Sequence, residues 1–248
     1  MIGVILQARM GSSRLPGKVL KNINNVPSIE FQINRIKKAK KVGKIILATS
    51  IKVSDDPIEE LCKEKGIICY RGSEEDVLER YFECAKLHNL STVVRLTGDC
   101  PLVDPKTIDL AIDSFFKNNT DYCSNTVPPD TSRWPDGSDV EVFSFNALQQ
   151  ANEEATDSED REHVTFFFWK KNFQRFKTHQ LPNEQDWSNF RYTIDYPEDY
   201  DAVKLIAEEL FQEKKIDFSI KDIINFLHSR PDITNLNSKF YFGEGWKQ

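Results

Sequence analysis

The segment QARMGSSRLPGK, from Gln7 to Lys18, constrains this chain more than any other part of its sequence. It follows Ile2–Leu6, a short apolar run that is typical of a parallel strand buried on both faces. It precedes Val19–Ala39, where the pattern predicts helix. A loop in this position, rich in glycine, serine and cationic residues, offers backbone N–H groups, hydroxyls and fixed positive charge. These are the groups that bind a polyphosphate.

Neither of the two commonest phosphate-binding motifs is present in this loop. It has no GK[ST] after four spacer residues, as in a Walker loop, and no GxGxxG, as in a dinucleotide fingerprint. An ordinary surface turn with solvated arginines is the alternative. Three cations among so many small residues, namely Arg9, Arg14 and Lys18, favour the polyphosphate site.

Composition limits the class of protein. The 248 residues, 39% of them hydrophobic and 29% charged, suit a soluble protein with one substantial core. The formal net charge of −6 argues against a general affinity for nucleic acid, so the basic loop favours a small anionic ligand. No apolar run is long enough to span a membrane, and the N-terminus lacks the pattern of a signal peptide.

Cysteine usage bears on the compartment of the protein. The cysteines are Cys62, Cys69, Cys84, Cys100 and Cys123, an odd number without a CxxC pair. This usage fits a reducing, cytoplasmic environment and argues against a zinc cluster.

The first half of the chain alternates strand and helix patterns. Strands are predicted at Ile2–Leu6, Lys44–Thr49, Ile67–Tyr70 and Thr92–Leu96. Helices are predicted at about Ser28–Lys40, Asp56–Lys65, Glu75–Leu87 and Pro105–Phe116. This succession predicts an α/β fold, in which a mostly parallel, twisted sheet is flanked by helices on both faces.

The second half of the chain has a different pattern. A proline-rich connection, Val127–Gly137, leads to a predicted strand at Asp139–Phe143. Further helices are predicted at about Phe145–Ala155, Asp160–Lys171, Glu198–Phe211 and Ser219–His228, and further strands at Arg175–Gln180 and Phe190–Ile194. The simplest interpretation is a single domain over residues 1–248, with a small β-rich flap at about 125–190.

Unusual residues follow one predicted strand after another. The basic loop follows the first strand, Thr49–Ser50 the second, Arg71–Ser73 the third, Thr97–Pro101 the fourth, and Asp195 the strand that ends at Ile194. Open α/β sheets bind their ligands outside the carboxyl ends of the strands. This convergence predicts one ligand site at that edge of the sheet, and it is stronger evidence than any single motif.

Two aspartates at this edge are candidate ligands for a divalent cation. Asp99 lies on a Gly-Asp-x-Pro turn, where its carboxylate faces the phosphates or, alternatively, closes an Asx-turn. Mg²⁺ suits such a site because it takes one or two carboxylates and completes its shell with phosphate oxygens and water. Asp195 is equally well placed to cap the helix that Pro197 begins, and the sequence leaves its two roles open.

Three further features have a structural alternative, which carries equal weight for the first and more weight for the other two. Asp139 and Glu141 alternate along a predicted strand, so they share one face, either as site residues or as solvated acids. His163 lies on a helix whose other face is apolar, where a packed or capping histidine is common. Phe166–Trp169 is interpreted as core or as a subunit contact, because four bulky apolar residues cover the whole helix circumference.

Several motifs together resemble the cytidylyltransferase family of spore-coat polysaccharide synthesis. They are QARMGSSRLPGK, RGSEEDVLERY, TGDCPLVDP, PDGSDVEVF, REHVT and YTIDYPEDY. That family is similar to the synthetases of CMP-sialic acid and CMP-Kdo. The resemblance runs from Met1 to about Leu210. It implies a Rossmann-like fold of the nucleotide-diphospho-sugar transferase type, Mg²⁺ as cofactor, and a homodimer in which residues 125–190 take part in acceptor binding and dimerisation.

The resemblance also implies roles for individual residues. The nucleotide-binding positions are Gln7, Ala8, Arg9, Gly11, Ser12, Ser13, Arg14, Lys18, Arg71, Gly72, Arg80, Thr97 and Gly98. Of these, Arg14 and Lys18 would act in catalysis on the triphosphate, whereas Arg71 and Arg80 would lie near the base and ribose. Asp99 and Asp195 match the positions that hold Mg²⁺. The positions that face the acceptor sugar are Asp136, Asp139, Glu141 and His163.

The favoured hypothesis is a nucleotidyltransferase. A sugar hydroxyl or phosphate attacks the α-phosphorus of a nucleoside triphosphate, which is CTP by resemblance, and pyrophosphate leaves. Such a reaction depends on positioning and charge stabilisation, which explains why no nucleophile triad is apparent. A nonulosonate-like acid or a sugar phosphate is the expected acceptor, for the synthesis of surface polysaccharide or glycan.

Two other functions stay open from the sequence. A glycosyltransferase that consumes a nucleotide-sugar would use an acidic metal-binding motif, and Asp139-Val140-Glu141 is the nearest approach to one. A non-catalytic nucleotide-binding module is the other. The base preference, the acceptor sugar and the oligomeric state are beyond what this sequence defines.

Overall fold

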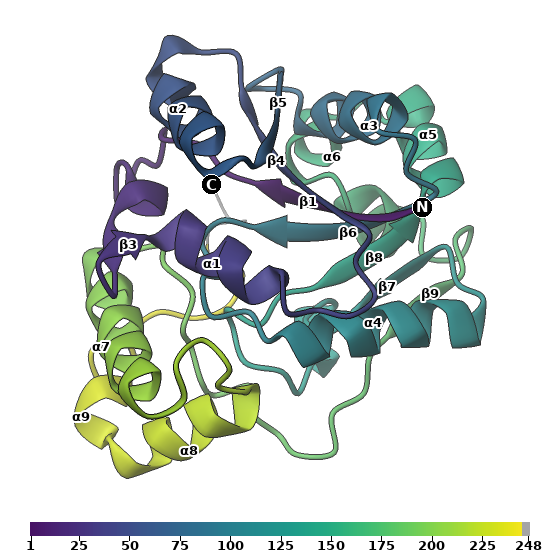
Figure 1. The fold of residues 1–248 in the computed structure, drawn as a ribbon. Coiled ribbons are helices and arrows are strands. Elements are labelled where there is room, and N and C mark those ends of the chain that lie inside the picture. The colour runs from purple at the N-terminus through teal and green to yellow at the C-terminus, as the bar shows by residue number, and fades with distance from the viewer. Residues whose placement is uncertain (245–248) are drawn as a thin grey trace.

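A seven-stranded sheet forms the centre of the structure, with the strand order β5-β4-β1-β6-β8-β7-β9. The computed structural model describes residues 1–244. The strands are β1 (Ile2–Gln7), β4 (Lys44–Ser50), β5 (Ile68–Gly72), β6 (Thr92–Thr97), β7 (Tyr122–Ser124), β8 (Glu141–Ser144) and β9 (Thr178–Gln180). Strand β8 runs antiparallel to β6 and β7, whereas the other neighbouring strands of this sheet are parallel. The prediction of a mostly parallel sheet flanked by helices is confirmed (Figure 1).

Helices pack on both faces of the sheet (Figure 1). One face is covered by α1 (Ser28–Ile36), α2 (Asp56–Lys65) and α4 (Pro105–Asn118), and the other by α3 (Val77–Leu87) and α5 (Phe145–Glu154). Side chains alternate along β1, so Val4 and Leu6 belong to the core of the first face and Ile5 to the core of the second.

A third group of helices packs beside the sheet, at the lower left of Figure 1. It consists of α7 (Pro197–Lys214), α8 (Ile220–Ser229) and the short α9 (Pro231–Thr234). These helices share a core with Phe31 of α1, and Arg35 of α1 donates hydrogen bonds to the carbonyls of Ile216 and Phe218. The C-terminal helices are thereby fixed against α1. No helix within residues 1–244 is both long and apolar enough to cross a bilayer.

The helix predicted over Val19–Ala39 is shorter than expected. A 3₁₀ turn and a hairpin of β2 (Asn22–Ile23) and β3 (Val26–Pro27) precede α1. Asn24 and Asn25 have positive φ angles of 50° and 66°, which a two-residue hairpin turn requires and asparagine tolerates. The local turn chemistry therefore prevails over the helical pattern in this segment.

Two elements predicted in the second half of the chain are also corrected. The helix predicted over Asp160–Lys171 is divided into α6 (Ser158–His163) and η4 (Phe167–Lys171), because Val164 between them has a positive φ of 60°. The segment Phe190–Ile194 is not a strand of the sheet. It runs past the end of β6 instead, where the Ile194 N–H donates to the carbonyl of Asp99 at 2.8 Å.

The segment from about 125 to 190, predicted as a small β-rich flap, contributes strands to the central sheet. Its strands β8 and β9 are paired within the central sheet, and the unpredicted strand β7 lies between them. Val142 and Phe143 are fully buried in the cores on opposite faces, so β8 needs cover on both sides. A strand of this kind belongs in the interior of a sheet.

Candidate active site

The loop after β1, Gln7–Lys18, is held in place by a buried carboxylate. Asp55, only 1% exposed, accepts hydrogen bonds from the Met10 N–H at 2.7 Å and from the hydroxyls of Thr49 and Ser50 at 3.0 and 2.5 Å. Burial opposes ionisation of Asp55, but these hydrogen bonds outweigh it and lower the pKa of the carboxyl. The loop is thereby tied to the end of β4.

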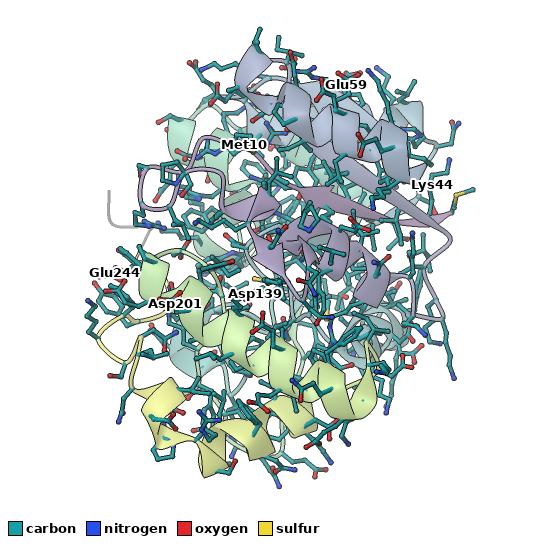
Figure 2. All side chains as sticks on the ribbon, turned by 60° about the vertical axis from the view of Figure 1, so that its left-hand side comes forward. Met10, Lys44, Glu59, Asp139, Asp201 and Glu244 are labelled. Carbon is teal, nitrogen blue, oxygen red and sulfur yellow. The ribbon has the colours of Figure 1, made fainter. Side chains whose placement is uncertain are left out.

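A cavity of about 440 Å³ opens beside this loop, at the carboxyl edge of the sheet. Figure 2 shows Lys44, at the start of β4, at the right-hand edge of the molecule, and Met10, after β1, and Asp139, before β8, nearer its middle. The predicted residues that line the cavity are Gln7, Ala8, Arg9, Gly11, Ser12, Ser13, Arg14, Lys18, Thr97, Gly98, Asp99, Asp136, Asp139, Glu141, His163 and Asp195. The structure therefore brings together segments that are far apart in the sequence, as expected from the positions of the strand ends.

Lys18 lines this cavity and contacts two carboxylates. Its Nζ lies 2.9 Å from Asp195 Oδ1 and 3.3 Å from Asp99 Oδ2, and it donates to the carbonyl of Ile194 at 2.6 Å. Burial alone would lower the pKa of Lys18, but the two carboxylates outweigh it and raise the pKa. Lys18 is therefore a charged ammonium between two carboxylates.

Asp195 is not the cap of the following helix. The N-cap of α7 is Tyr196, and the backbone N–H groups of Asp195 and Tyr196 both donate to Asp199 Oδ2 at 3.0 Å. The side chain of Asp195 instead contacts Lys18 and, at 3.1 Å, Arg14. Burial opposes its ionisation, but these cations outweigh burial and lower the pKa of Asp195 to about 2. The capping alternative left open by the sequence is therefore wrong.

Asp99 follows β6 at a point where the chain approaches β1 closely. A Cβ on the preceding Gly98 would lie 3.1 Å from the carbonyl oxygen of Gln7 and 3.2 Å from the Cβ of Ala8, so glycine suits this position. The Asp99 carboxylate accepts hydrogen bonds from the Thr97 hydroxyl at 2.5 Å and from the Lys18 ammonium. It faces the cavity and does not close a turn as the Asx alternative required.

Asp99 and Asp195 form a donor set that fits Mg²⁺. Both carboxylates contact one cationic group, the Lys18 ammonium, so both face a common point that already attracts positive charge. The described residues contain no group of three or more His, Cys, Asp or Glu side chains placed to hold a metal. A set of two carboxylates is typical of Mg²⁺ sites that are completed by substrate phosphates and water.

The acceptor positions predicted from the resemblance lie in a second part of the cavity. Asp136 forms an ion pair with Arg191. Asp139 accepts hydrogen bonds from the Thr126 hydroxyl at 2.8 Å and the Gly137 N–H at 2.9 Å, and burial raises its pKa to about 6. Asp136 is buried and Asp139 is half-buried, and both carboxyls have defined partners, so Asp139 is not the solvated acid of the structural alternative.

Glu141 and His163 complete this part of the cavity. The Glu141 carboxylate forms an ion pair with Arg95 and accepts a hydrogen bond from the Tyr122 hydroxyl at 2.5 Å. With these partners, Glu141 gives little support to a metal-binding motif at Asp139-Val140-Glu141. The ring of His163 stacks on Phe166 with centroids 4.3 Å apart, and burial lowers the pKa of the imidazole.

Three predicted nucleotide-binding residues do not line the cavity, namely Arg71, Gly72 and Arg80. The Arg71 guanidinium forms ion pairs of 2.7 Å with both Asp56 and Glu59, which gives it a role between β5 and α2. A Cβ on Gly72 would lie 2.9 Å from the side chain of Arg80, so this glycine makes room for the arginine. A place of Arg71 and Arg80 beside the base stays a prediction, and both residues lie outside the lining of the cavity.

Arg80 differs from Arg71 in its surroundings. It is 1% exposed, and its Nη1 donates to the carbonyl of Ser73 at 2.6 Å. Its Nε and Nη2 are buried without a hydrogen-bond partner among the described residues. Burial lowers the pKa of the guanidinium, and the neighbouring Arg9 lowers it further. A role of Arg80 near the nucleotide stays a prediction.

Sequence reasoning missed several residues of the cavity. They are Val77, Arg95, Cys100, Thr126, Glu162, Thr165, Arg191, Thr193 and the segment Tyr241–Glu244, with the core residues Val19 and Val127. Arg191 stands four positions before Asp195, so a cation beside the acidic motif was a usable signal. Phe167 and Phe168 belong to the core as expected, whereas Phe166 and Trp169 line the cavity.

The fold and the cavity define the class of this protein as an α/β nucleotidyltransferase. A cationic loop after the first strand faces two aspartates at the carboxyl edge of a mostly parallel sheet. This arrangement provides positive charge for phosphates and oxygen ligands for a divalent cation.

Comparisons with known proteins identify the family. A family model described as cytidylyltransferase matches residues 3–223. The chain is 39% identical over 240 residues to an uncharacterized protein of Methanocaldococcus jannaschii, covering 96% of this chain and 94% of that protein. It is 32% identical over 234 residues to the spore coat polysaccharide biosynthesis protein SpsF of Bacillus subtilis, covering 92% and 94% of the two chains.

A solved structure agrees with these relatives. A cytidylyltransferase from Leptospira borgpetersenii serovar Hardjo-bovis superposes with a TM-score of 0.87 at 34% identity, covering 94% of this chain and 96% of that one. The chain belongs to the cytidylyltransferase family.

Proposed function

We propose that this enzyme transfers a cytidylyl group from CTP to a sugar acceptor and releases pyrophosphate, with Mg²⁺ as cofactor. The position of the Lys18 ammonium between Asp99 and Asp195, beside the cationic loop, carries the proposal. The family description and the SpsF relative support CTP as the donor and polysaccharide synthesis as the setting.

The loop cations bind and stabilise the triphosphate. Arg9 makes no ion pair with any described residue, so its full charge is available to a ligand. Arg14 and Lys18 lie against Asp195 and can exchange this partner for phosphate oxygens when the donor binds. Charge that develops on the leaving pyrophosphate is then offset by groups already in place, which is the main source of catalysis in such transfers.

The carboxylates of Asp99 and Asp195 would hold the divalent cation. When bound, Mg²⁺ neutralises phosphate charge and polarises the reacting oxygens. The hydroxyl of Thr97 orients Asp99 by its hydrogen bond to Oδ1. The ammonium of Lys18 lies beside both carboxylates, where it limits their mutual repulsion in the absence of substrate.

The acceptor sugar would bind among Asp136, Asp139, Glu141 and His163. These side chains line the same cavity as the loop and provide hydrogen-bond acceptors for hydroxyl groups. The aromatic rings of His163 and Phe166 offer an apolar wall against a sugar ring. A nonulosonate-like acid and a sugar phosphate are the two acceptor classes to test first.

We also propose that residues 1–248 form one nucleotidyltransferase domain, cytoplasmic in location, and that residues 125–190 contribute to a homodimer. Strand β9 is the last strand of the sheet, and Phe173 just before it is 56% exposed. A pocket beside this edge is lined by Tyr122, Val127, Pro128, Trp169, Phe173, Thr178, His179 and Gln180. An exposed strand edge next to apolar side chains favours a second copy of the chain as partner.

Thermal melting with CTP, with and without Mg²⁺, tests the proposed function. A ligand that binds only the folded state stabilises it, by about 2.7 kcal/mol at one hundred times its dissociation constant. We expect CTP to raise the melting temperature and Mg²⁺ to increase that shift. Inorganic triphosphate is the control that separates recognition of the base from binding of the phosphates. Absence of a shift with all four nucleoside triphosphates would contradict the proposal. If a nucleotide does bind, measuring pyrophosphate release with sugar acids and with sugar phosphates would identify the acceptor.

A further inference from the structure

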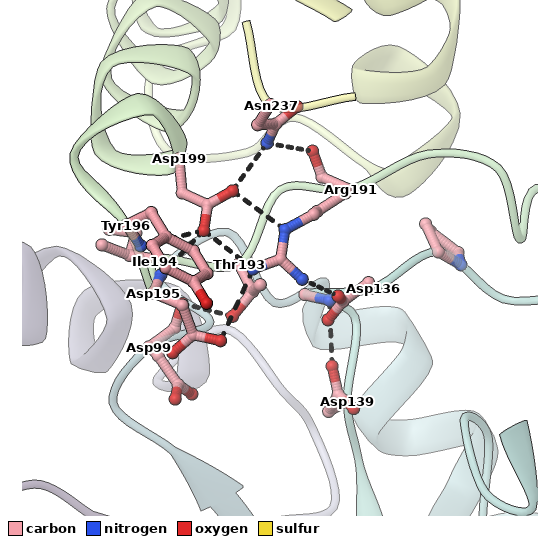
Figure 3. A network of polar contacts seen from close by, with 12 residues as sticks. Asp99, Asp136, Asp139, Arg191, Thr193, Ile194, Asp195, Tyr196, Asp199 and Asn237 are labelled. Carbon is pink, nitrogen blue, oxygen red and sulfur yellow. Dashed lines mark hydrogen bonds and ion pairs between the residues drawn. The ribbon is translucent and has the colours of Figure 1, made fainter. Parts of the chain in front are cut away.

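One buried arginine connects the two parts of the cavity. Arg191, whose side chain is 9% exposed, contacts three carboxylates (Figure 3). Its Nη1 pairs with Asp136, and its Nη2 lies 2.8 Å from Asp199 Oδ2 and 3.5 Å from Asp195 Oδ2. Asp195 belongs to the part that would hold the divalent cation, and Asp136 to the part that would hold the acceptor.

Groups outside the cavity fix the orientation of this guanidinium. Asp199, fully buried at the start of α7, accepts from Arg191 Nε at 2.9 Å as well as from Nη2. Asn237 in turn donates to Asp199 Oδ1 at 2.9 Å and to the carbonyl of Arg191 at 3.3 Å. Figure 3 shows Asn237 and Asp199 on one side of the guanidinium and Asp136 on the other. Asp199 and Asn237 thus fix Arg191 on the side away from the cavity, while its guanidinium contacts two carboxylates that line the cavity.

The planar guanidinium is suited to this arrangement because its donors have a fixed geometry. Asp199 accepts from both Nε and Nη2, Nη1 pairs with Asp136, and Nη2 also lies 3.5 Å from Asp195 Oδ2. A lysine ammonium in the same place would keep the charge but not the fixed angles between its contacts. Loss of this guanidinium would leave Asp136 and Asp199 without their cationic partner, whereas Asp195 would keep its contacts with Lys18 and Arg14.

We infer that Arg191 is a positioning residue that holds Asp195 in place for the divalent cation and links it to the acceptor-side carboxylate Asp136. The inference rests on the proposed function. Residues behind a metal ligand that orient it commonly affect metal affinity by 10–100-fold when replaced. Neither the family model nor the names of the relatives assign a role to this arginine.

The test measures the Mg²⁺ concentration that half-saturates CTP binding, by thermal shift and by calorimetry without any acceptor. In Arg191→Lys we expect this concentration to rise about tenfold or more. The matched control is Arg35→Lys, since Arg35 is also fully buried but donates to the carbonyls of Leu102, Val103, Ile216 and Phe218, away from the cavity. The control should lose stability and keep the wild-type Mg²⁺ dependence.

A second variant keeps the test decisive if Arg191→Lys does not fold. Asn237→Ala removes one donor to Asp199 and leaves every cavity carboxylate in place, and it should raise the same concentration severalfold. The link to Asp136 is tested by combining Asp136→Asn with Arg191→Lys. The double variant should raise the half-saturating Mg²⁺ concentration by less than the product of the two single-variant factors, because both changes break the same connection.

The outcomes separate this inference from the proposed function. Absence of Mg²⁺-dependent CTP binding in the wild-type protein would contradict the proposed function itself. Normal binding in the wild type, with an unchanged Mg²⁺ requirement in Arg191→Lys or in Asn237→Ala, would overturn the positioning role alone. Fully multiplicative effects of Asp136→Asn and Arg191→Lys would overturn the link between the two carboxylates.

Discussion

The ammonium of Lys18 donates to the carboxylate of Asp195 at 2.9 Å, although 177 positions separate the two residues in the chain. The same ammonium lies 3.3 Å from Asp99. Three segments meet at this point: the loop after β1, the end of β6 and the residues before α7. Because all three side chains are largely buried, a change in one of them alters the electrostatic energy of the others.

We expect Lys18→Ala to reduce kcat by two to three orders of magnitude. The ammonium offsets charge on the leaving pyrophosphate, and loss of one such group costs about 2.7–4 kcal/mol in the barrier. The fold should persist, since Lys18 packs in no apolar core. Pyrophosphate release measures the rate, and circular dichroism checks the fold. A rate within about threefold of the wild type, less than 1 kcal/mol, would show that this loop is not the triphosphate site.

The fold was largely predictable because its dominant signals are local. Ile2–Leu6, Lys44–Thr49 and Thr92–Leu96 are apolar runs of strand length, and each became a strand of the parallel sheet. Strand β7 was missed because Tyr122–Ser124 is only three residues long and lacks a periodic pattern. Its strand conformation comes from pairing with β8 and β9, which are distant in sequence.

The candidate site was predictable to the extent that it follows strand ends. Arg71 lies outside the lining of the cavity. The sequence shows a cation at the end of β5 but not that the carboxylates of Asp56 and Glu59 pair with it. Arg191 was missed although it stands close to Asp195 in the sequence. Its role depends on Asp136 and Asn237, which reach it only through tertiary structure.

A pair of arginine variants tests which cations face the nucleotide. Arg9→Ala should weaken CTP binding about tenfold, about 1.4 kcal/mol, with little change in melting temperature. Arg71→Ala should leave CTP binding within twofold, because Arg71 is occupied by Asp56 and Glu59 outside the cavity. Its loss should lower the melting temperature by a few degrees, as expected for exposed ion pairs worth up to about 1 kcal/mol. Calorimetry with CTP distinguishes the two, and stronger loss of binding in Arg71→Ala would reverse the assignment.

Asp139 should make stability depend on pH near neutrality. Burial raises the pKa of its carboxyl to about 6, so the folded state holds a proton that the unfolded chain has already lost above pH 4. The stabilisation is fully present below the unfolded pKa of about 3.9 and is lost as the pH rises through about 6. Relative to Asp139→Asn, the wild-type protein should therefore melt at a higher temperature at pH 5 than at pH 8. Melting curves of both proteins across this range check the sign, and a constant difference between them would refute the assignment.

Asp99→Asn and Asp195→Asn test whether the two carboxylates hold one cation. Each single change should cost several kcal/mol in kcat/KM, and the double variant should cost little more, because the first change already disables the shared site. Both carboxylates also neutralise Lys18, so each variant should lose some stability, which melting curves measure separately. The Mg²⁺ concentration that half-saturates the rate should rise in both single variants. Additive losses in kcat/KM, with an unchanged Mg²⁺ requirement in Asp195→Asn, would contradict the shared site. Asp195 would then be only an ion-pair partner of Lys18, Arg14 and Arg191, and Asp99 the sole ligand from this pair.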